Sequence, residues 1–157
     1  MTRRGVLLAS IPLLRAAAPK LTIQRLVTRK HTIGRRDYLF LEIETGDGIT
    51  GVGEGSISGR IEIVEQAIQW FTPYLKGKDA SGIEEHWNRN YYQLSRYRSG
   101  PVLMTALAAI DIALWDIAGK ALERPVWSLL GAAEPPVLRA YYSHWSQELT
   151  PDRKSVV

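Results

Sequence analysis

The sequence contains no cysteine, which excludes disulfide bonds and thiol-rich metal sites. It also lacks an apolar run of the roughly 18 residues that a membrane-spanning helix requires, so a membrane partner is not expected. The chain has 157 residues, which is enough for one ordinary domain. A complete eight-stranded α/β barrel needs about 250 residues, so the chain cannot contain one.

Acidic residues are scarce at the amino terminus, and this local imbalance accounts for most of the net charge of +4. Arg3, Arg4 and Arg15 lie in the first 18 residues, where no acid occurs. Without them the basic and acidic residues number 17 and 16. A nucleic-acid-binding domain would need a basic stripe on a folded face. The nearest cluster, Arg96-Tyr97-Arg98, is typical of a solvated loop, so no nucleic-acid partner is expected.

Residues 1–18 have the layout of a signal peptide: a charged start, a short apolar core that ends at Leu14, and small residues at 16–18. Arg3-Arg4 followed by Val6-Leu7 resembles a twin-arginine export signal, which predicts a periplasmic or exported protein. Arg15 interrupts the approach to a cleavage site, and the alternative is a cytoplasmic protein with a frayed leader. In either case these residues are not expected to belong to the fold.

From Lys20 the sequence predicts three strands. The first covers 20–28 and is followed by a polar break at 29–36. The second covers 38–45, where apolar residues alternate with polar ones as in a half-buried strand. A tight turn at 46–48 leads to the third strand at 49–54. The apolar positions of the second strand are Leu39, Leu41 and Ile43. We therefore expect a three-stranded antiparallel meander.

Helices are predicted from residue 61 onward. The first is expected to run from Ile61 to a break at Pro73. Ser81 and Glu84 are spaced as a capping box that would open the second helix. Pro101 is suited to the first position of a third, long helix. Strands followed by helices indicate an α+β fold, with a helical bundle after the meander.

The long helix is rich in alanine, which would allow another element to approach closely. Its two aspartates, Asp111 and Asp116, lie about 140° apart around a helix of 3.6 residues per turn, so they do not form one carboxylate pair. Asp116 and Lys120 are four residues apart in the favourable acid-first order. These aspartates are therefore expected to orient helix packing or cap backbone groups.

The helix and the turn after it carry a set of residues in fixed register. They are Ala108, Ala109, Asp111, Ala113, Trp115, Asp116, Gly119, Lys120, Pro125 and Leu129-Leu130-Gly131. This set resembles the first signature region of the mandelate racemase/muconate lactonizing enzyme family, within the enolase superfamily. Gly53-Glu54-Gly55 followed by Gly59-Arg60 resembles the Gly-Glu turn and the Gly-Arg pair of this family. The run 97–107 is similar to its sugar-acid dehydratase branch, galactonate dehydratase in particular.

The resemblance implies an enolase-like N-terminal capping domain over residues 19–133. Residues 134–157 would begin a truncated barrel domain, with only its first strand, 137–145, present. In the complete family enzyme a barrel holds Mg²⁺ on carboxylates, and a lysine or histidine removes a proton α to the substrate carboxylate. This chain has no Lys-x-Lys after residue 137. We therefore assign it no catalytic residue and no metal ligand, and we expect it not to bind Mg²⁺.

The resemblance also implies where an acid sugar would contact the chain. In the family, the loops after the first and third strands fold over the barrel mouth, and here they correspond to 29–36 and 55–60. Cations in these loops suit an acidic substrate. The candidate substrate-binding residues are His31, Arg35, Arg36 and Arg60, with His144 at the end of strand 137–145. The alternative is that these cations are merely solvated and that His144 packs in a core.

Two interpretations of function follow. The chain is either the substrate-capping portion of a Mg²⁺-dependent acid-sugar dehydratase, inactive by itself, or a free-standing binding module without catalysis. In the first case, surfaces that pack against a barrel would be uncovered on residues 102–122 and at Trp127. Self-association of the chain is then expected, because exposed apolar surface promotes it.

Overall fold

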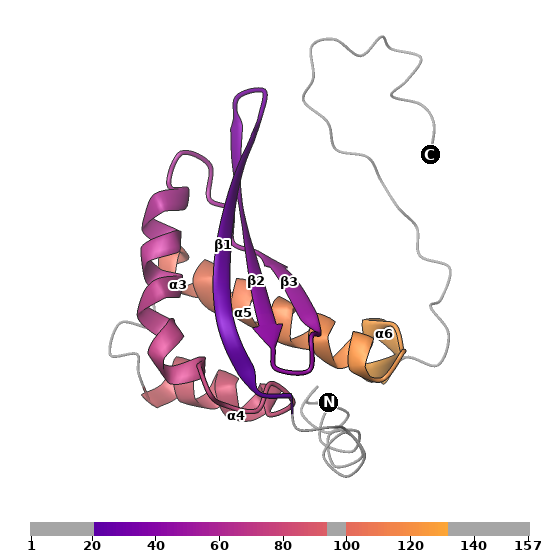
Figure 1. The fold of residues 1–157 in the computed structure, drawn as a ribbon. Helices are drawn as coiled ribbons and strands as arrows, with labels where there is room; N and C mark the ends of the chain where they lie inside the picture. Colours follow the sequence, from indigo (N-terminus) through magenta and orange to yellow (C-terminus); the bar gives the residue numbers. More distant parts are fainter. Residues whose placement is uncertain (1–20, 94–99, 132–157) are drawn as a thin grey trace, which may run out of the picture.

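A computed structural model describes residues 21–93 and 100–131, and the two predicted end segments, 1–18 and 134–157, lie outside them. The order of elements is β1 (Ile23–Ile33), β2 (Arg36–Thr45), β3 (Thr50–Glu54), α3 (Ile61–Leu75), α4 (Ile83–Asn88), η1 (Arg89–Gln93), α5 (Pro101–Ala121) and α6 (Val126–Leu129) (Figure 1). Strands come first and helices follow, which confirms the predicted α+β fold.

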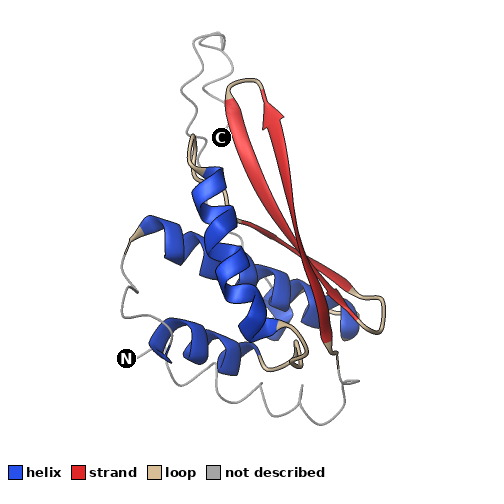
Figure 2. Ribbon diagram, turned by 60° about the vertical axis from the view of Figure 1, so that its left-hand side comes forward, coloured by secondary structure: helices blue, strands red, loops and turns tan. Residues whose placement is uncertain are grey.

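The three strands form one antiparallel sheet in the order β1-β2-β3. Leu39, Leu41 and Ile43 are completely buried on one face, as their alternation predicted. Figure 2 shows the helices gathered on that side of the twisted sheet, so the core lies between the two layers. The strand bounds differ from the prediction at one place. β1 does not stop at residue 28 but continues to Ile33, so most of the expected loop 29–36 is strand.

Helix α5 packs directly on β3, and glycine makes this contact possible. A Cβ atom added to Gly53 would overlap the carbonyl oxygen of Ala109, and one on Gly51 would overlap that of Ala113. Both alanines are fully buried. The small residues of α5 therefore do allow a close approach, and the partner that approaches is β3 of the same domain.

Helix α3 differs from its prediction because Pro73 lies inside it instead of ending it. Proline removes one backbone hydrogen bond and usually kinks a helix. Here only two residues follow, and the second of them, Leu75, is completely buried. Burial of this side chain stabilises the last turn in spite of the proline. Trp70, on the same helix, is 47% exposed.

The predicted capping box at the start of α4 is wrong. Gly82 is the N-cap, and no side chain caps the helix. Ser81 instead donates its backbone N–H and its hydroxyl to the Asp79 carboxylate, at 3.0 and 2.9 Å. The segment before α4 also pairs with the start of β1, because the N–H of Ile23 bonds the Lys78 carbonyl at 2.8 Å. These bonds fix the loop without the capping box.

Helix α5 starts with Pro101 at its first turn, as predicted. By length and hydropathy it is long and apolar enough to cross a membrane, contrary to the expectation that no segment would be. Half of its most apolar stretch is buried within the domain, as in the core helix of a soluble protein. The outer face of α5 and the turn of α6 still expose three large apolar side chains: Ile112, Trp127 and Leu130.

Candidate functional site

The β1–β2 hairpin extends beyond the helices and carries three of the predicted site residues (Figure 1). His31 lies in β1 opposite Tyr38, and Arg36 begins β2 opposite Ile33. Arg35 lies in the connecting turn, which contains just two residues. The turn is short because Gly34, its first residue, has a φ of +62°. Glycine at that position is typical of a type II′ hairpin, and this was the signal the sequence prediction missed.

The β3–α3 connection carries the fourth site residue. Gly55 donates its N–H to the Leu39 carbonyl at 2.8 Å, and the Ser56 hydroxyl accepts the Leu39 N–H at 3.0 Å. Arg60 is the N-cap residue of α3 and donates from Nη1 to the Gly59 carbonyl at 2.6 Å. The end of β3 pairs with Phe40, so this loop leaves the sheet at the same end as the hairpin turn (Figure 1).

Positive charge at this end of the sheet is only partly neutralised. Arg29 contacts Glu42 at 2.8 Å, and Lys30 contacts Glu65 at 2.6 Å. His31, Arg35 and Arg36 are exposed, and none of them forms an ion pair with a residue that the structure describes. Uncompensated guanidinium groups suit a carboxylate ligand, which they can hold through two parallel hydrogen bonds. We call His31, Arg35, Arg36 and Arg60 the cationic rim.

Glu65 of α3 anchors the hairpin that carries this rim. Its carboxylate accepts the Thr28 hydroxyl at 2.7 Å and contacts the Lys30 ammonium at 2.6 Å. These hydrogen bonds, from Lys30 first and Thr28 second, hold the pKa of Glu65 below its usual value. The sequence analysis did not single out Glu65. The available signal was its spacing, four residues after Ile61 and three before Ile68, which places it next to the buried face of α3.

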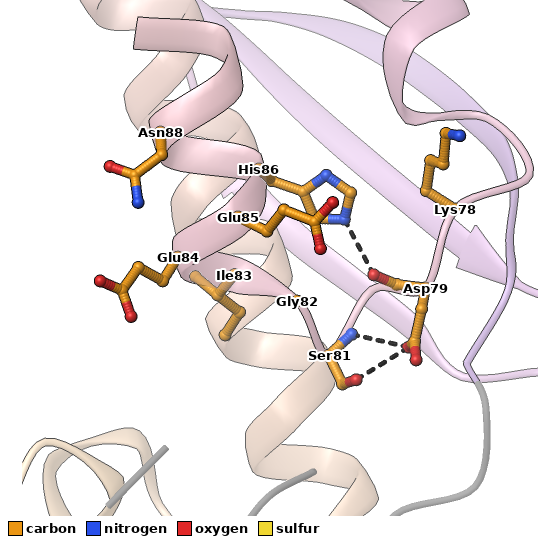
Figure 3. Close-up of a pocket in the computed structure, with 9 residues that line it drawn as sticks. All are labelled: Lys78, Asp79, Ser81, Gly82, Ile83, Glu84, Glu85, His86 and Asn88. Carbon is orange, nitrogen blue, oxygen red and sulfur yellow. Dashed lines mark hydrogen bonds between the residues drawn. The ribbon is translucent and has the colours of Figure 1, made fainter. Parts of the chain in front are cut away.

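An open depression of about 460 Å³ lies at the other end of the domain, at the start of α4. Figure 3 shows hydrogen bonds among three of its lining residues, Asp79, Ser81 and His86. His86 is buried, and its ring nitrogen Nε2 lies 2.8 Å from the Asp79 carbonyl oxygen. The Asp79 carboxylate accepts hydrogen bonds from the backbone N–H and the hydroxyl of Ser81. These contacts give Asp79, Ser81 and His86 a structural role, and none of the residues that line the depression belongs to the cationic rim.

Within residues 21–93 and 100–131, no group of three or more histidine, aspartate or glutamate side chains is arranged to hold a metal ion. Asp111 is half-buried, and burial raises its pKa. It has no hydrogen-bond partner among the described residues. His144, the fifth predicted site residue, and the strand 137–145 lie outside the part of the chain that the structure describes.

Residues 14–131 match the family described as mandelate racemase / muconate lactonizing enzyme, N-terminal domain. The chain belongs to this family. A D-galactonate dehydratase of Klebsiella pneumoniae (strain 342) is 45% identical over 122 residues, which are 78% of this chain and 30% of that protein. The likeness to the galactonate dehydratase branch, which the run 97–107 suggested, is thereby confirmed.

Solved structures agree with the fold and the family. An enolase from Pantoea ananatis, crystallised with bound D-gluconate and Mg, has a TM-score of 0.67 and 39% identity, covering 71% of this chain and 27% of that one. An enolase from Agrobacterium radiobacter, with bound Na and L-malate, has a TM-score of 0.67 and 30% identity over 71% and 28% of the two chains. The chain thus spans less than a third of these relatives' length.

Proposed function

We propose that the chain is the substrate-capping portion of a Mg²⁺-dependent acid-sugar dehydratase, and that its cationic rim contacts the carboxylate of the sugar acid. The observation that carries the proposal is that two cation-bearing segments lie toward the same end of the sheet. One segment is the hairpin turn with Arg35 and Arg36. The other is the Gly55–Arg60 loop, whose Arg60 lies 24 residues after Arg36 in the sequence. Together they offer several cations to one ligand.

The chemistry of the rim favours an anionic sugar over a neutral one. Arginine binds carboxylates through two parallel hydrogen bonds, whereas a neutral sugar offers hydroxyl groups that gain little from a charge. All four residues are exposed, so their interaction with a ligand is screened by salt beyond about 10 Å at 0.1 M ionic strength. We therefore infer weak, salt-dependent binding of the carboxylate to this portion alone. Mg²⁺ and the proton-abstracting base are assigned to the remainder of a complete enzyme.

The proposal is tested by comparing ligands and variants of the whole 157-residue chain. D-Galactonate should bind with a dissociation constant of about 1 mM or weaker, and D-galactose should bind still more weakly. The double variant Arg35→Gln/Arg36→Gln should lose most of this preference. Lys78→Gln, which removes a cation at the α4 depression, is the matched control and should keep it. Equal binding of the acid and the neutral sugar would refute the proposal.

A second candidate function, a free-standing binding module without catalysis, has one observation in its favour. The apolar core is closed by the domain's own sheet and helices, with α5 sealed against β3 through Gly51 and Gly53. Light scattering and binding of a dye for apolar surface separate the two candidates. A self-associating, dye-binding chain supports a capping portion that lacks its neighbouring domain. A dye-silent monomer with cooperative melting supports the free-standing module.

A further inference from the structure

Strand β3 forms one edge of the sheet, and its outward backbone groups are bound by two side chains of α5. Asp116 accepts the N–H of Val52 at 2.8 Å. Lys120 donates from Nζ to the carbonyl oxygen of Thr50 at 2.7 Å and to the Asp116 carboxylate at the same distance. An edge strand normally leaves such groups unpaired. Here one acceptor and one donor stand where the carbonyl and N–H of a neighbouring strand would be.

The hydrogen bonds from Asp116 and Lys120 restrain β3 along the axis of α5, a direction in which the glycine contacts do not restrain it. The overlap that any Cβ on Gly51 or Gly53 would cause limits how closely β3 approaches α5. A contact between smooth backbone surfaces does little to prevent sliding along the helix axis. The bonds from Asp116 and Lys120 are directional and bind two successive outward positions of the strand, Thr50 and Val52. They therefore fix the position of β3 along α5.

The strand so held leads straight into the Gly55–Arg60 loop. Gly55 lies against the Ala109 side chain of α5, so the loop begins on the same helix that holds β3. We infer that Asp116 and Lys120 are positioning residues that set the place of this loop, and with it Arg60, relative to the hairpin. The inference about the loop stands on the contacts alone. Its consequence for an acid sugar rests on the proposed function.

The test is amide hydrogen exchange in the 157-residue chain. Asp116→Ala should speed exchange at Val52 about tenfold or more, because a hydrogen bond to a charged group contributes that much protection. It should also shift the amide resonances of residues 55–60. Asp111→Ala, on the same helix and without a hydrogen-bond partner among the described residues, is the matched control and should do neither. Unchanged exchange at Val52, or unchanged resonances at 55–60, would overturn the inference.

Two further variants separate positioning from simple helix stabilisation. The charge swap Asp116→Lys/Lys120→Asp restores an ion pair four residues apart, but a lysine cannot accept the Val52 N–H. If the pair merely stabilised α5, the swap would restore normal exchange at Val52; we expect that it does not. Asp116→Asn keeps an acceptor oxygen and should retain most of the protection of the Val52 amide. This variant also provides the test if Asp116→Ala does not fold. Loss of protection in the asparagine variant equal to that in the charge swap would contradict the assigned role.

Measuring D-galactonate binding to the same variants connects the inference to the proposed function. If the rim binds D-galactonate, Asp116→Ala should weaken that binding several-fold, and Asp111→Ala should not. If the unmodified chain fails to bind D-galactonate, the proposed function is refuted, while the exchange data still decide whether Asp116 and Lys120 position the loop. If the ligand binds equally well to Asp116→Ala, the loop does not need this support, and the inference fails in its functional part.

Discussion

Gly53 of β3 lies directly against Ala109 of α5, so closely that a side-chain carbon on residue 53 would overlap the Ala109 carbonyl oxygen. Both residues are buried, and the atom in the way belongs to the backbone of a 21-residue helix. Such an obstacle cannot rotate aside as a flexible side chain would. The separation of the helix layer from the edge of the sheet therefore depends on glycine at this position.

Gly53→Ala should consequently destabilise the domain by about 2 kcal/mol or more, because α5 would have to shift as a whole to admit the methyl group. Chemical denaturation of the purified variant measures this directly. Gly82→Ala is the matched control: its φ is −78° and the nearest atoms to an added Cβ lie 3.5 Å away. It should cost about 1 kcal/mol or less. Equal losses of stability in both variants would show that the close approach of β3 to α5 at Gly53 does not contribute to the stability of the domain.

The anchoring of the hairpin by Glu65 should depend on pH. Because its pKa is lowered in the folded protein, the Glu65 carboxylate contributes stability above its unfolded pKa, about 4.3, and loses that contribution as the pH falls through the folded value. Glu65→Gln should therefore be less stable than the unmodified chain at pH 7, by less than about 1 kcal/mol for a partly exposed pair. The difference should shrink as the pH falls below the unfolded pKa and the carboxylate becomes protonated.

Urea unfolding midpoints at pH 7, 5 and 3 test this. Glu62→Gln, on the same helix and without a hydrogen-bond partner in the described part of the chain, serves as the control and should change stability little at any of these values. A constant difference between Glu65→Gln and the unmodified chain across the series would mean that the carboxylate charge does not anchor the hairpin.

The sequence predicted elements whose own residues carry a pattern. Leu39, Leu41 and Ile43 alternate, and Pro101 marks a helix start; both predictions hold in the structure. The hairpin tip was misjudged because residues 29–33 of β1 are all exposed, so no alternation between buried and exposed positions signals a strand. Pro73 was misjudged because the burial of Leu75, a tertiary effect, outweighs the local preference.

The role of the candidate site residues stays a prediction. Family resemblance pointed to His31, Arg35, Arg36 and Arg60. What the sequence could not provide was the set of contacts between distant residues. The Glu65 anchor joins residues 37 positions apart, and the Asp116 bond to Val52 joins residues 64 apart. Such pairs arise only when the packing of α3 and α5 on the sheet is known.

The 157-residue chain is expected to have no dehydratase or racemase activity. The described residues include no group suited to hold Mg²⁺, and the sequence contains no Lys-x-Lys after residue 137. Incubation with D-galactonate or D-gluconate and Mg²⁺ should leave the sugar acid unchanged over many hours. Turnover that a chelator abolishes would show that the chain holds a metal and a base in some other way.

We also propose that residues 1–18 direct export, since they combine Arg3-Arg4, a short apolar core and small residues before Pro19. Fractionation of the native host should find mature protein outside the cytoplasm, with an amino terminus near Pro19 or Lys20. Arg3→Lys/Arg4→Lys should block export if the twin-arginine route is used. Cytoplasmic protein that retains Met1 would contradict this.

The central claim, that one end of the sheet forms a rim for an acid sugar, is tested most directly by titrating the isotope-labelled chain with D-galactonate. Backbone amide resonances then report which residues meet the ligand. The account predicts that residues 31–36 and 55–60 shift together with one saturation curve, and that the shifts shrink as salt screens the cations. Shifts confined to residues 78–88 around the α4 depression, or no salt-dependent shifts at the rim, would contradict it.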